Sequence, residues 1–406
     1  MNENAGINRK LKIAVLFGGR SGEHEVSLDS ARSVLGVLDP EKYEVFEVGI
    51  THLGEWLTGP DARLAMEKGQ TRELLPCAIL PDPSKPGLYL LRSTNSMQSL
   101  EHPTPKEPLE NWGRRVQAFG CEKLTDLDVV FPALHGTYGE DGTLQGLLEM
   151  TDLAYVGAGV TGSSVGMDKA VFKEVMCAIG IPTVESILVL RSEIKKDIEE
   201  VIRRAETVAA YPLFIKPANL GSSVGITKCN RRADLGEALL EAASYDRRVL
   251  VERSVDAREI EVSVLGNDDP QASVPGEVLP SREFYSYESK YIDGTSRLLI
   301  PAPLPASMSE EIRRMAVSAF KAIDCAGMAR VDFFLEKTNT ERTGTGGKIY
   351  LNELNTIPGF TSISMYPKLW EASGLPYAGL VDRLVELALE RKADRNRTER
   401  RFRSTS

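Results

Sequence analysis

The order of the first apolar segments restricts the fold of this chain more than any other feature of its sequence. Residues 12–19, KIAVLFGG, form a short apolar run that ends in glycines, which predicts a buried strand. Residues 27–39 have helical spacing, and residues 43–50, YEVFEVGI, predict a second strand. A strand, a helix and a strand in this order favour a parallel sheet with crossover helices. We therefore expect the chain to begin with an α/β domain.

A further buried strand is predicted at residues 127–134, directly before the polar stretch HGTYGEDGTLQGLLE. Ligands of parallel α/β sheets bind at the carboxyl ends of the strands, so residues 18–25 and 135–141 are expected to line one crevice. Residues 54–115, between these segments, are rich in proline, glycine and charge and show few clear periods. We predict an irregular insertion there, whose function the sequence does not indicate.

Two further α/β units are predicted after the first. The segment MDKAVFKEVMCAIGIP predicts a helix that ends at Gly180 and Pro182. The residues of its apolar face are Val171, Phe172, Val175, Met176 and Ile179. The second unit continues with a charged helix at 192–208 and with three predicted strands, at 186–190, 212–218 and 248–255. The third unit opens with REIEVSVLG and carries MARVDFFLE and KIYLNELN.

The length of 406 residues exceeds what one ordinary hydrophobic core organises, and it predicts several domains. We expect the following division: a disordered tail at 1–10, a first domain at 11–160, a second at 161–257, a third at 258–390 and a disordered basic tail at 391–406. The alternative for the basic tail is an arm that binds nucleic acid or a membrane.

The composition argues against several classes of partner. The net charge of −9 disfavours nucleic acid as the main partner, because binding to a phosphate backbone needs a cationic surface. The sequence starts without an apolar signal segment and has no run of about 18 apolar residues for a membrane span. Five cysteines are scattered singly, at 77, 121, 177, 229 and 325, which fits reduced thiols better than disulfides or zinc. We expect a cytoplasmic protein that binds neither nucleic acid nor membranes.

The pentapeptide GSSVG occurs twice, at 162–166 and at 221–225. Such loops suit phosphate oxygens, because glycine lets backbone amides approach and serine adds donors. The second copy follows a predicted strand that carries Lys216, and this combination suits a triphosphate. For the first copy the candidate ligand is Lys169, at the start of the following helix. The alternatives are a polar hairpin tip beside an incidental lysine for the second copy and a surface lysine for the first.

The stretch GAGVTG, at 157–162, matches the dinucleotide pattern G-x-G-x-x-G. The strand before it is short and no ribose-binding acid follows on a second strand, so a plain turn is favoured over a dinucleotide site. The standard phosphate-loop pattern G-x-x-x-x-G-K-[ST] is absent. An oxidoreductase that binds NAD is the rival hypothesis that this stretch raises.

Two segments of the third unit predict a metal site. Strand alternation places Arg330, Asp332 and Phe334 on one face of RVDFFLE, and Leu351, Glu353 and Asn355 on one face of YLNELN. If the two strands pair as a hairpin across TNTERTGTGG, the two carboxylates and the amide converge. These hard oxygen ligands suit Mg²⁺ that also holds phosphate oxygens. The alternative is a set of charges on a solvated sheet face.

Seven motifs, taken in order, resemble those of one family. They are GGRSGEHEVSL, ALHGTYGEDGTLQGLLE, GMDK, IKPANLGSSVG, SYESKY, ARVDFFL and NELNTIPGFTSISMYP. This series closely resembles the D-alanine–D-alanine ligases of the ATP-grasp superfamily over about residues 11–390, apart from the middle insertion. The resemblance implies an α/β substrate domain followed by two ATP-grasp subdomains that clasp ATP between them.

The resemblance also implies an activity. It is the ligation of two D-alanines at the expense of ATP, with ADP and phosphate as products, for peptidoglycan precursors of the cell wall. In this chemistry the carboxylate of one D-alanine attacks the γ-phosphate and becomes an acyl phosphate, which the amine of the second D-alanine then attacks. The protein contributes positioning and charge neutralisation rather than proton chemistry of its own.

The resemblance assigns substrate-binding and catalytic roles to named residues. Glu23 resembles the acid that binds the ammonium group of the first D-alanine, with His135 nearby. Arg330 and the backbone N–H of Gly359 resemble the stabilisers of the oxyanion. Ser364 resembles the contact to the carboxylate of the second substrate.

Further residues match the nucleotide and metal site of the family. Lys169 and Lys216 resemble the lysines on the ATP phosphates, and Ser222 and Tyr291 resemble a catalytic pair that links the phosphate loop to a lid excluding water. The metal ligands, which imply two Mg²⁺ or Mn²⁺ ions, fall on Asp332, Glu353 and Asn355. The remaining ATP contacts fall on Ser223, Glu252, Arg253, Val255, Glu259, Phe284, Lys290, Phe334, Asn352 and Glu353. Arg253 departs from the lysine of many relatives.

The resemblance leaves rivals and partners to be decided. A ligase of the same fold that makes D-alanyl-D-lactate is the nearest alternative. Such enzymes carry phenylalanine in place of the lid tyrosine, or a different lid, so Tyr291 favours D-alanine. A non-catalytic nucleotide-binding protein of this fold is expected to lack a metal ligand or a lysine, and none is missing. The family further implies a homodimer, with K⁺ as a candidate activator.

Overall fold

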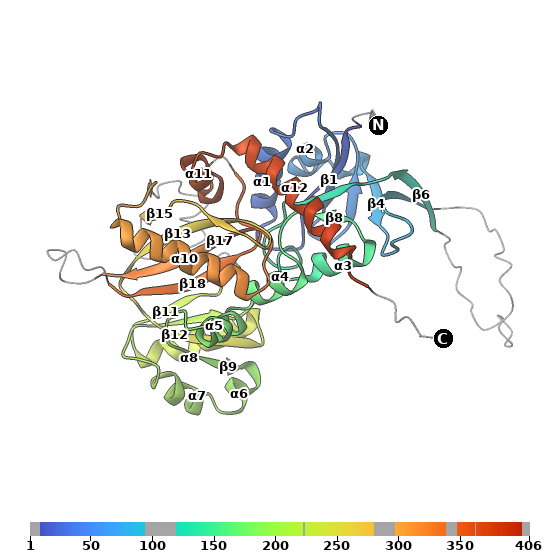
Figure 1. Ribbon diagram of the computed structural model, residues 1–406. Coiled ribbons are helices and arrows are strands. Elements are labelled where there is room, and N and C mark those ends of the chain that lie inside the picture. The colour runs from blue at the N-terminus through green and yellow to red at the C-terminus, as the bar shows by residue number, and fades with distance from the viewer. Residues whose placement is uncertain are drawn as a thin grey trace, which may run out of the picture.

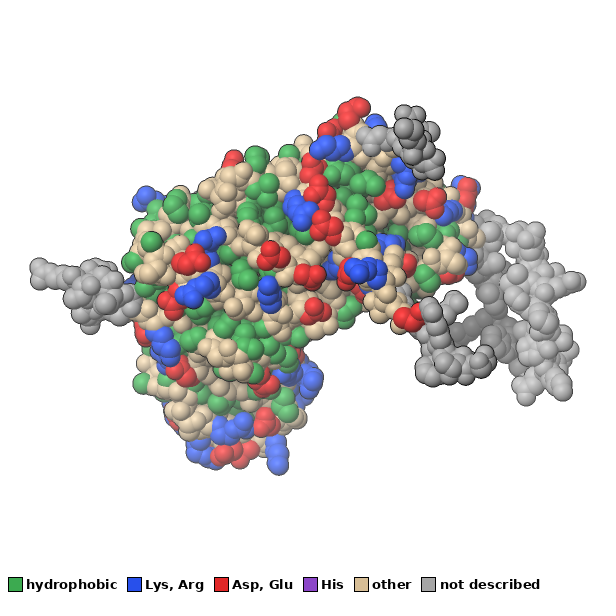
Figure 2. Space-filling view, in the orientation of Figure 1, with side chains coloured by type: hydrophobic (Ala, Val, Ile, Leu, Met, Phe, Trp, Pro, Cys, Tyr) green, Lys and Arg blue, Asp and Glu red, His purple; other side chains and the backbone are tan. Residues whose placement is uncertain are grey.

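The computed structural model describes residues 9–93, 119–221, 224–279, 297–337, 347–361 and 363–399. Three sheets, each covered by helices, make up this part of the chain (Figure 1). The predicted catalytic and ATP-binding residues Ser222, Ser223, Phe284, Lys290 and Tyr291 lie outside the described residues. In Figure 2, basic and acidic side chains are interspersed over the visible face.

The first sheet has eight strands in the order β6-β5-β4-β3-β2-β1-β7-β8. The bounds of these strands are β1 (Leu11–Gly18), β2 (Tyr43–Ile50), β3 (Trp56–Thr58), β4 (Leu75–Ile79), β5 (Leu88–Ser93), β6 (Phe119–Thr125), β7 (Val129–Pro132) and β8 (Ala154–Tyr155). Strand β1 pairs in parallel with β2 and β7, and β7 pairs in parallel with β8. The predicted parallel sheet is therefore confirmed. Helices α1 (His24–Leu35) and α3 (Thr143–Thr151) pack on it, and α4 (Val160–Met167) follows β8 in the chain.

The region predicted as an irregular insertion extends this sheet. Strands β3, β4, β5 and β6 add to β2 in antiparallel pairing, and α2 (Ala62–Glu67) with the 3-10 helix η1 (Thr71–Glu73) lies between β3 and β4. The prediction of irregular structure is wrong for residues 56–93, and residues 94–118 lie outside the described part. The strands are short and proline-punctuated, so the period of two is hard to recognise in the sequence.

The second sheet is antiparallel, in the order β11-β10-β12-β9. The bounds of its strands are β9 (Ser186–Leu190), β10 (Leu213–Pro217), β11 (Thr227–Cys229) and β12 (Arg248–Arg253). The helices of this unit are α5 (Lys169–Ala178), α6 (Arg191–Lys196), α7 (Ile198–Ala205) and α8 (Arg232–Tyr245). The single charged helix predicted at 192–208 is two helices, because Asp197 caps α7 by accepting a hydrogen bond from the Glu200 amide.

Helices α4 and α5 differ from the predictions made for them. The first GSSVG copy lies within α4 and forms no loop. Helix α5 begins at Lys169, because the Asp168 side chain caps it by accepting from the backbone amides of Ala170 and Val171. Ile179 is 48% exposed beyond the end of α5, so its assignment to the apolar face is wrong. Lys173 is buried on that face instead.

The third sheet has six strands, with the order β16-β15-β13-β17-β18 and with β14 attached to β13. The bounds of its strands are β13 (Ala257–Gly266), β14 (Gln271–Ala272), β15 (Gly276–Leu279), β16 (Arg297–Leu299), β17 (Gly327–Glu336) and β18 (Ile349–Asn355). Helix α10 (Ala306–Ala322) buries Ile312, Ala316 and Phe320 in a core shared with β13 and β17. The antiparallel β17–β18 pair confirms the predicted hairpin.

The last helices return to the first domain. After α11 (Met365–Ala372), helix α12 (Tyr377–Arg395) crosses toward α3 and β8, as its red ribbon in Figure 1 shows. Leu380, Leu384 and Leu387 of α12 share one buried cluster with Ile13 and Phe131 of the first sheet. The predicted disordered tail begins too early, because residues 391–395 are helical. Among the residues described, a helix with the length and apolarity needed to cross a membrane is not found.

Candidate active site

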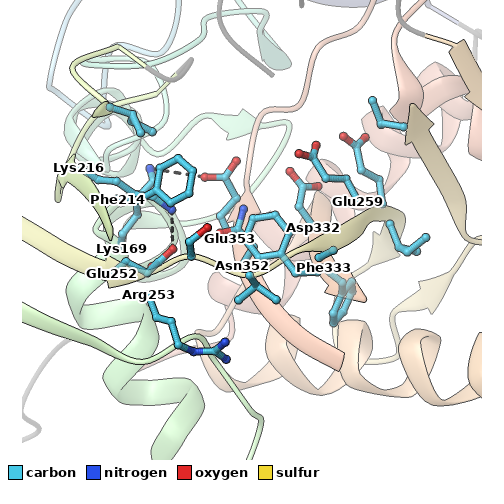
Figure 3. A pocket seen from close by; sticks show the side chains of 18 of the residues that line it. Lys169, Phe214, Lys216, Glu252, Arg253, Glu259, Asp332, Phe333, Asn352 and Glu353 are labelled. Atoms are coloured by element: carbon cyan, nitrogen blue, oxygen red, sulfur yellow. Dashed lines mark hydrogen bonds and ion pairs between the residues drawn. The ribbon is translucent and has the colours of Figure 1, made fainter. Parts of the chain in front are cut away.

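A cavity of about 890 Å³ lies between the second and third sheets. In Figure 3, Lys169 and Lys216 lie on one side of it, and Asp332 and Glu259 lie on the other. Its walls include residues of β10, β12, β13, β17 and β18. The predicted site residues that line it are Lys169, Lys216, Glu252, Arg253, Val255, Glu259, Asp332, Phe334, Asn352, Glu353 and Asn355.

Lys216 is held by a buried carboxylate. Its Nζ atom lies 2.6 Å from Oε1 of Glu252. Glu252 lies on β12 directly opposite Phe214 of β10, two residues before Lys216. The other carboxylate oxygen, Oε2, lies 2.7 Å from Nζ of Lys173, which also donates to the Val184 carbonyl at 2.9 Å. Burial opposes ionisation of Glu252, yet the charges of Lys216 and Lys173 lower its pKa to about 2. Burial lowers the pKa of Lys173.

Lys169 lies at the point where the first two units meet. As the first residue of α5, it donates through its backbone amide to the Ala218 carbonyl at 2.9 Å. Its Nζ atom donates to the Leu220 carbonyl at 2.8 Å and lies 3.5 Å from Oε2 of Glu353. The lysine therefore lies beside both the second glycine–serine segment and a predicted metal ligand.

A bulge changes the face that β18 presents to the cavity. Asp332 pairs with Glu353, but the next residue of β17, Phe333, pairs with Leu351, so Asn352 is the extra residue. As a result Leu351 is fully buried in the core, and its predicted place beside Glu353 is wrong. Asn352 and Glu353 both line the cavity.

Asp332 and Asn355 lie together at the base of the hairpin. The Asn355 Nδ2 atom donates to Asp332 Oδ2 at 3.1 Å, and Arg330 donates to both Asp332 oxygens at 2.8 and 2.7 Å. Burial opposes the charge of Arg330, but Asp332 and Glu261 raise its pKa well above the ordinary value. The Arg330 Nε atom lies 3.1 Å from Glu261 Oε2. Arg330 is therefore a fixed cation beside the predicted metal ligands.

The donor set of this hairpin fits a small hard cation. Two carboxylates, Asp332 and Glu353, are direct cross-strand partners, and the Asn355 side chain already contacts one of them. Carboxylate and amide oxygens are the ligands that Mg²⁺ prefers. Within the described ranges, no three His, Cys, Asp or Glu side chains gather into a metal-ligating group, so the protein supplies few ligands here. Such an open set suits an ion that also binds phosphate oxygens.

The predicted crevice of the first domain opens beside this cavity. Ser21 Oγ donates to the His135 carbonyl at 2.9 Å, which joins the segments after β1 and β7. Glu23 is 8% exposed and packs against two glycines: a Cβ atom would lie 2.6 Å from its Oε2 at Gly136 and 2.8 Å at Gly221. Residues 18–25 and 135–141 therefore meet, as predicted, at the carboxyl edge of the sheet.

Other predicted substrate residues are committed to contacts with the protein. His135 is buried, its Nδ1 lies 2.9 Å from the Ile357 carbonyl, and its Nε2 lies 2.8 Å from Ser30 Oγ. Ser364 is the residue before α11, and its Oγ contacts Thr361 Oγ1 at 2.7 Å. Gly359 lies against Ser364, since a Cβ atom there would be 3.0 Å from that Oγ. These residues do not line the cavity itself.

Sequence reasoning missed three buried charged residues. Lys173 binds Glu252, Glu261 pairs with Arg330, and Glu140 lines the cavity from the first domain. Lys173 follows Lys169 by four positions, so the helical repeat places both lysines on one face, and this spacing could have revealed it. Glu140 is part of the quoted HGTYGEDG motif, but no periodicity distinguishes it from its exposed neighbours.

Family models match most of the chain. The model described as the D-ala D-ala ligase N-terminus matches residues 12–158, and the model described as the D-ala D-ala ligase C-terminus matches residues 175–386. The D-alanine--D-alanine ligase of Caldicellulosiruptor bescii is 46% identical over 94% of this chain and 96% of that protein. The D-alanine--D-alanine ligase of Thermoanaerobacter pseudethanolicus is 48% identical over 94% and 97%, respectively.

Solved structures give the same result. The D-alanine-D-alanine ligase from Coxiella burnetii is similar with a TM-score of 0.74 and 36% identity, covering 95% of this chain and 96% of that one. A D-Ala:D-Ser ligase from Enterococcus faecalis has a TM-score of 0.76 and 32% identity, covering 94% and 100%. The chain therefore belongs to the D-alanine–D-alanine ligase family and has its ATP-grasp fold.

Proposed function

We propose that this protein is a D-alanine–D-alanine ligase that consumes ATP and supplies the dipeptide for peptidoglycan synthesis. The observation that carries the proposal is the cavity itself, where two lysines face Asp332 and Glu353 while the Glu23 crevice opens beside them. Near-full-length relatives at 46–48% identity support the same activity. Complete sets of lysines and acids argue against a non-catalytic nucleotide-binding protein, and a NAD-dependent oxidoreductase has no support in these relatives.

ATP occupies the cavity between the two sheets in this proposal. Lys169 and Lys216 neutralise its phosphates, and the Gly221–Gly225 segment contributes backbone amides and hydroxyl groups. Glu252, Arg253, Val255 and the other ATP residues hold the base and ribose. Because Glu252 already binds Lys216 at 2.6 Å, the lysine is oriented before the nucleotide arrives.

The two D-alanines bind in the crevice toward the first domain. Glu23 accepts hydrogen bonds from the ammonium group of the first, and Ser364 binds the carboxylate of the second. The first carboxylate attacks the γ-phosphate and becomes an acyl phosphate, with ADP as the leaving group. The amine of the second D-alanine then attacks this carbonyl, and phosphate leaves. Arg330 and the Gly359 N–H stabilise the negative charge that develops on the carbonyl oxygen.

Divalent metal ions are required by this family, and the hairpin residues would hold them. Asp332, Glu353 and Asn355 provide the hard oxygen donors for two Mg²⁺ or Mn²⁺ ions. The ions would neutralise charge on the transferred phosphoryl group. We also propose K⁺ as an activator, a homodimer, the three domains at 11–160, 161–257 and 258–390, and a cytoplasmic location that suits five free cysteines.

One assay tests the main proposal against its rivals. Phosphate release from ATP and Mg²⁺ is measured with D-alanine, L-alanine, D-lactate, D-serine or no acceptor, with Lys216→Met as the inactive control. We expect release that depends on D-alanine and the dipeptide as product. Release without a D-amino acid would contradict the ligase, and use of D-lactate alongside D-alanine at neutral pH would overturn the D-alanine assignment. The D-serine arm is included because a solved relative is a D-Ala:D-Ser ligase.

A further inference from the structure

The segment that carries Gly359 is held from the opposite domain. Thr356, Ile357 and Phe360 are buried, whereas Gly359 is only partly covered. The buried Glu140, from the segment after β7, accepts a hydrogen bond from the Ile357 amide at 3.1 Å through Oε2. Its other oxygen, Oε1, accepts from the Gly136 amide at 3.0 Å. One carboxyl group thus joins the Glu23 crevice of the first domain to the loop after β18.

A second chain of hydrogen bonds runs in parallel. Because a carbonyl can only accept, His135 donates through Nδ1 to the Ile357 carbonyl at 2.9 Å. Burial lowers the pKa of His135, so the neutral ring leaves Nε2 to accept from Ser30 Oγ at 2.8 Å. Ser30 Oγ in turn accepts from the Phe360 amide at 3.3 Å. Every donor in this chain has an acceptor.

The two series of hydrogen bonds fix the residues on both sides of Gly359. The Ile357 peptide is bound at its N–H by Glu140 and at its C=O by His135, and the Phe360 N–H is bound by Ser30. The Phe360 carbonyl accepts from the Tyr377 hydroxyl at 2.7 Å. Between these fixed points, the direction of the Gly359 N–H has little freedom.

We infer that Glu140, assisted by Ser30 and His135, is a positioning residue that aims the Gly359 N–H at the reacting carbonyl by fixing the loop at 356–360 from the first domain. The inference rests on the proposed ligase function. It differs from substrate binding: His135 acts through the Ile357 carbonyl, and Glu140 acts through two backbone amides. Preorganised donors of this kind lose their effect when they are displaced by a fraction of an ångström to an ångström.

The surroundings of Glu140 make a carboxyl group specifically necessary. Glu23 and Arg330 are the charged side chains that act on it. A glutamine of the same size keeps one acceptor oxygen but presents an NH₂ donor to the other backbone amide. Either the Gly136 or the Ile357 amide then faces a donor in a buried place, and the loop must shift to relieve that contact.

The test combines kinetics with hydrogen exchange on the full-length protein. Glu140→Gln and Ser30→Ala are compared with the wild type and with a matched control, Glu149→Gln. Glu149 is a carboxylate of α3 that contacts the Tyr155 hydroxyl and Arg395, outside the site. The readouts are kcat, the KM for ATP, and exchange of the backbone amides at Ile357 and Phe360.

For Glu140→Gln we expect kcat to fall about 10- to 100-fold while the KM for ATP changes less than about threefold. The Ile357 amide should exchange faster in this variant and not in Glu149→Gln. Ser30→Ala should speed exchange at Phe360 and reduce kcat about three- to tenfold. If Glu140→Gln does not fold, the result for Ser30→Ala tests the inference by itself.

A wild-type kcat in the folded variants, or a loss confined to the KM for ATP, would overturn the inference. Unchanged exchange of the Ile357 and Phe360 amides in these variants would also overturn it. A wild type that does not ligate D-alanine would defeat the proposed function instead, and the exchange readout would still report whether Glu140 and Ser30 hold the loop.

Discussion

Lys173 and Lys216 bind the same buried carboxylate from two directions, with distances of 2.7 and 2.6 Å from their Nζ atoms to the two oxygens of Glu252. Glu252 is 2% exposed, so its negative charge is stabilised by the two ammonium groups and not by water. Only Lys216 was recognised from its place on a strand before a glycine–serine segment. Lys173 binds one oxygen of Glu252, and the other oxygen orients Lys216, the lysine that reaches the cavity.

This three-residue cluster predicts unequal costs for its members. Glu252→Gln leaves two buried ammonium groups that repel each other, and we expect a loss of about 3–5 kcal/mol of unfolding free energy. Lys173→Met leaves the neutral Lys216–Glu252 pair and an unpaired Val184 carbonyl, at about 1–2 kcal/mol. Urea unfolding at pH 7 measures both. Equal losses would show that Lys173 is as necessary as the carboxylate.

The hairpin site predicts a change in metal dependence. Asp332→Asn removes one of the two cross-strand carboxylates and should reduce kcat by about 100-fold or more, since charge stabilisation at the phosphoryl group weakens. The Mg²⁺ concentration for half-maximal rate should rise. The control is Asp324→Asn, an exposed residue with φ of 54°, where asparagine is well tolerated. A normal Mg²⁺ titration for Asp332→Asn would exclude this residue as a ligand.

The two GSSVG copies should respond differently to the same substitution. Ser222→Ala should lower kcat strongly, because that serine belongs to the proposed phosphate loop. Ser163 is fully buried in α4, and its hydroxyl has no hydrogen-bond partner within the described part of the chain. Ser163→Ala should therefore leave activity unchanged and stability unchanged or slightly higher. Steady-state kinetics and thermal unfolding of both variants decide, and equal kinetic effects would contradict the ranking.

Glu140 predicts a pH dependence of stability. Burial and the charge of Glu23 raise its pKa to about 8, while the Gly136 and Ile357 amides and Arg330 act in the opposite direction. Between about pH 5 and 8 the folded protein retains a proton that the unfolded chain has released, so this group's contribution to stability falls as pH rises. The stability difference between wild type and Glu140→Gln should shrink by roughly 2–4 kcal/mol from pH 5.5 to 8. A constant difference in urea unfolding would contradict the raised pKa.

The sequence was sufficient for elements with a strong period and a clear end. β1, β2 and the β17–β18 hairpin were predicted because buried runs and alternation determine them. Strands of three to six residues at 56–93 were not, since so short a segment carries little periodic signal. Helix α5 shows the same limit at residue scale, where Ile179 lies beyond the helix end and Lys173 occupies the buried face.

Within the site, the sequence predicted which polar residues come together better than it predicted the face on which each residue lies. Asp332, Glu353 and Asn355 converge on one cavity as expected, but the bulge at Asn352 removes Leu351 from that face. A period of two cannot anticipate an extra residue on one strand. Glu140 and Glu261 were missed because their partners, a backbone amide and an arginine, come from distant parts of the chain.

The position of α12 has a consequence for how the chain is made. Leu380, Leu384 and Leu387 pack in one cluster with Ile13 and Phe131, so β1 shares a core with a helix that lies more than 350 residues later. Residues of α1 and α2 belong to the same cluster, but during synthesis at the ribosome this core lacks the side chains of α12 until the segment containing Leu387 has emerged. The first domain therefore cannot complete its core during translation, and a chaperone that shields apolar sheet surface would find its substrate there.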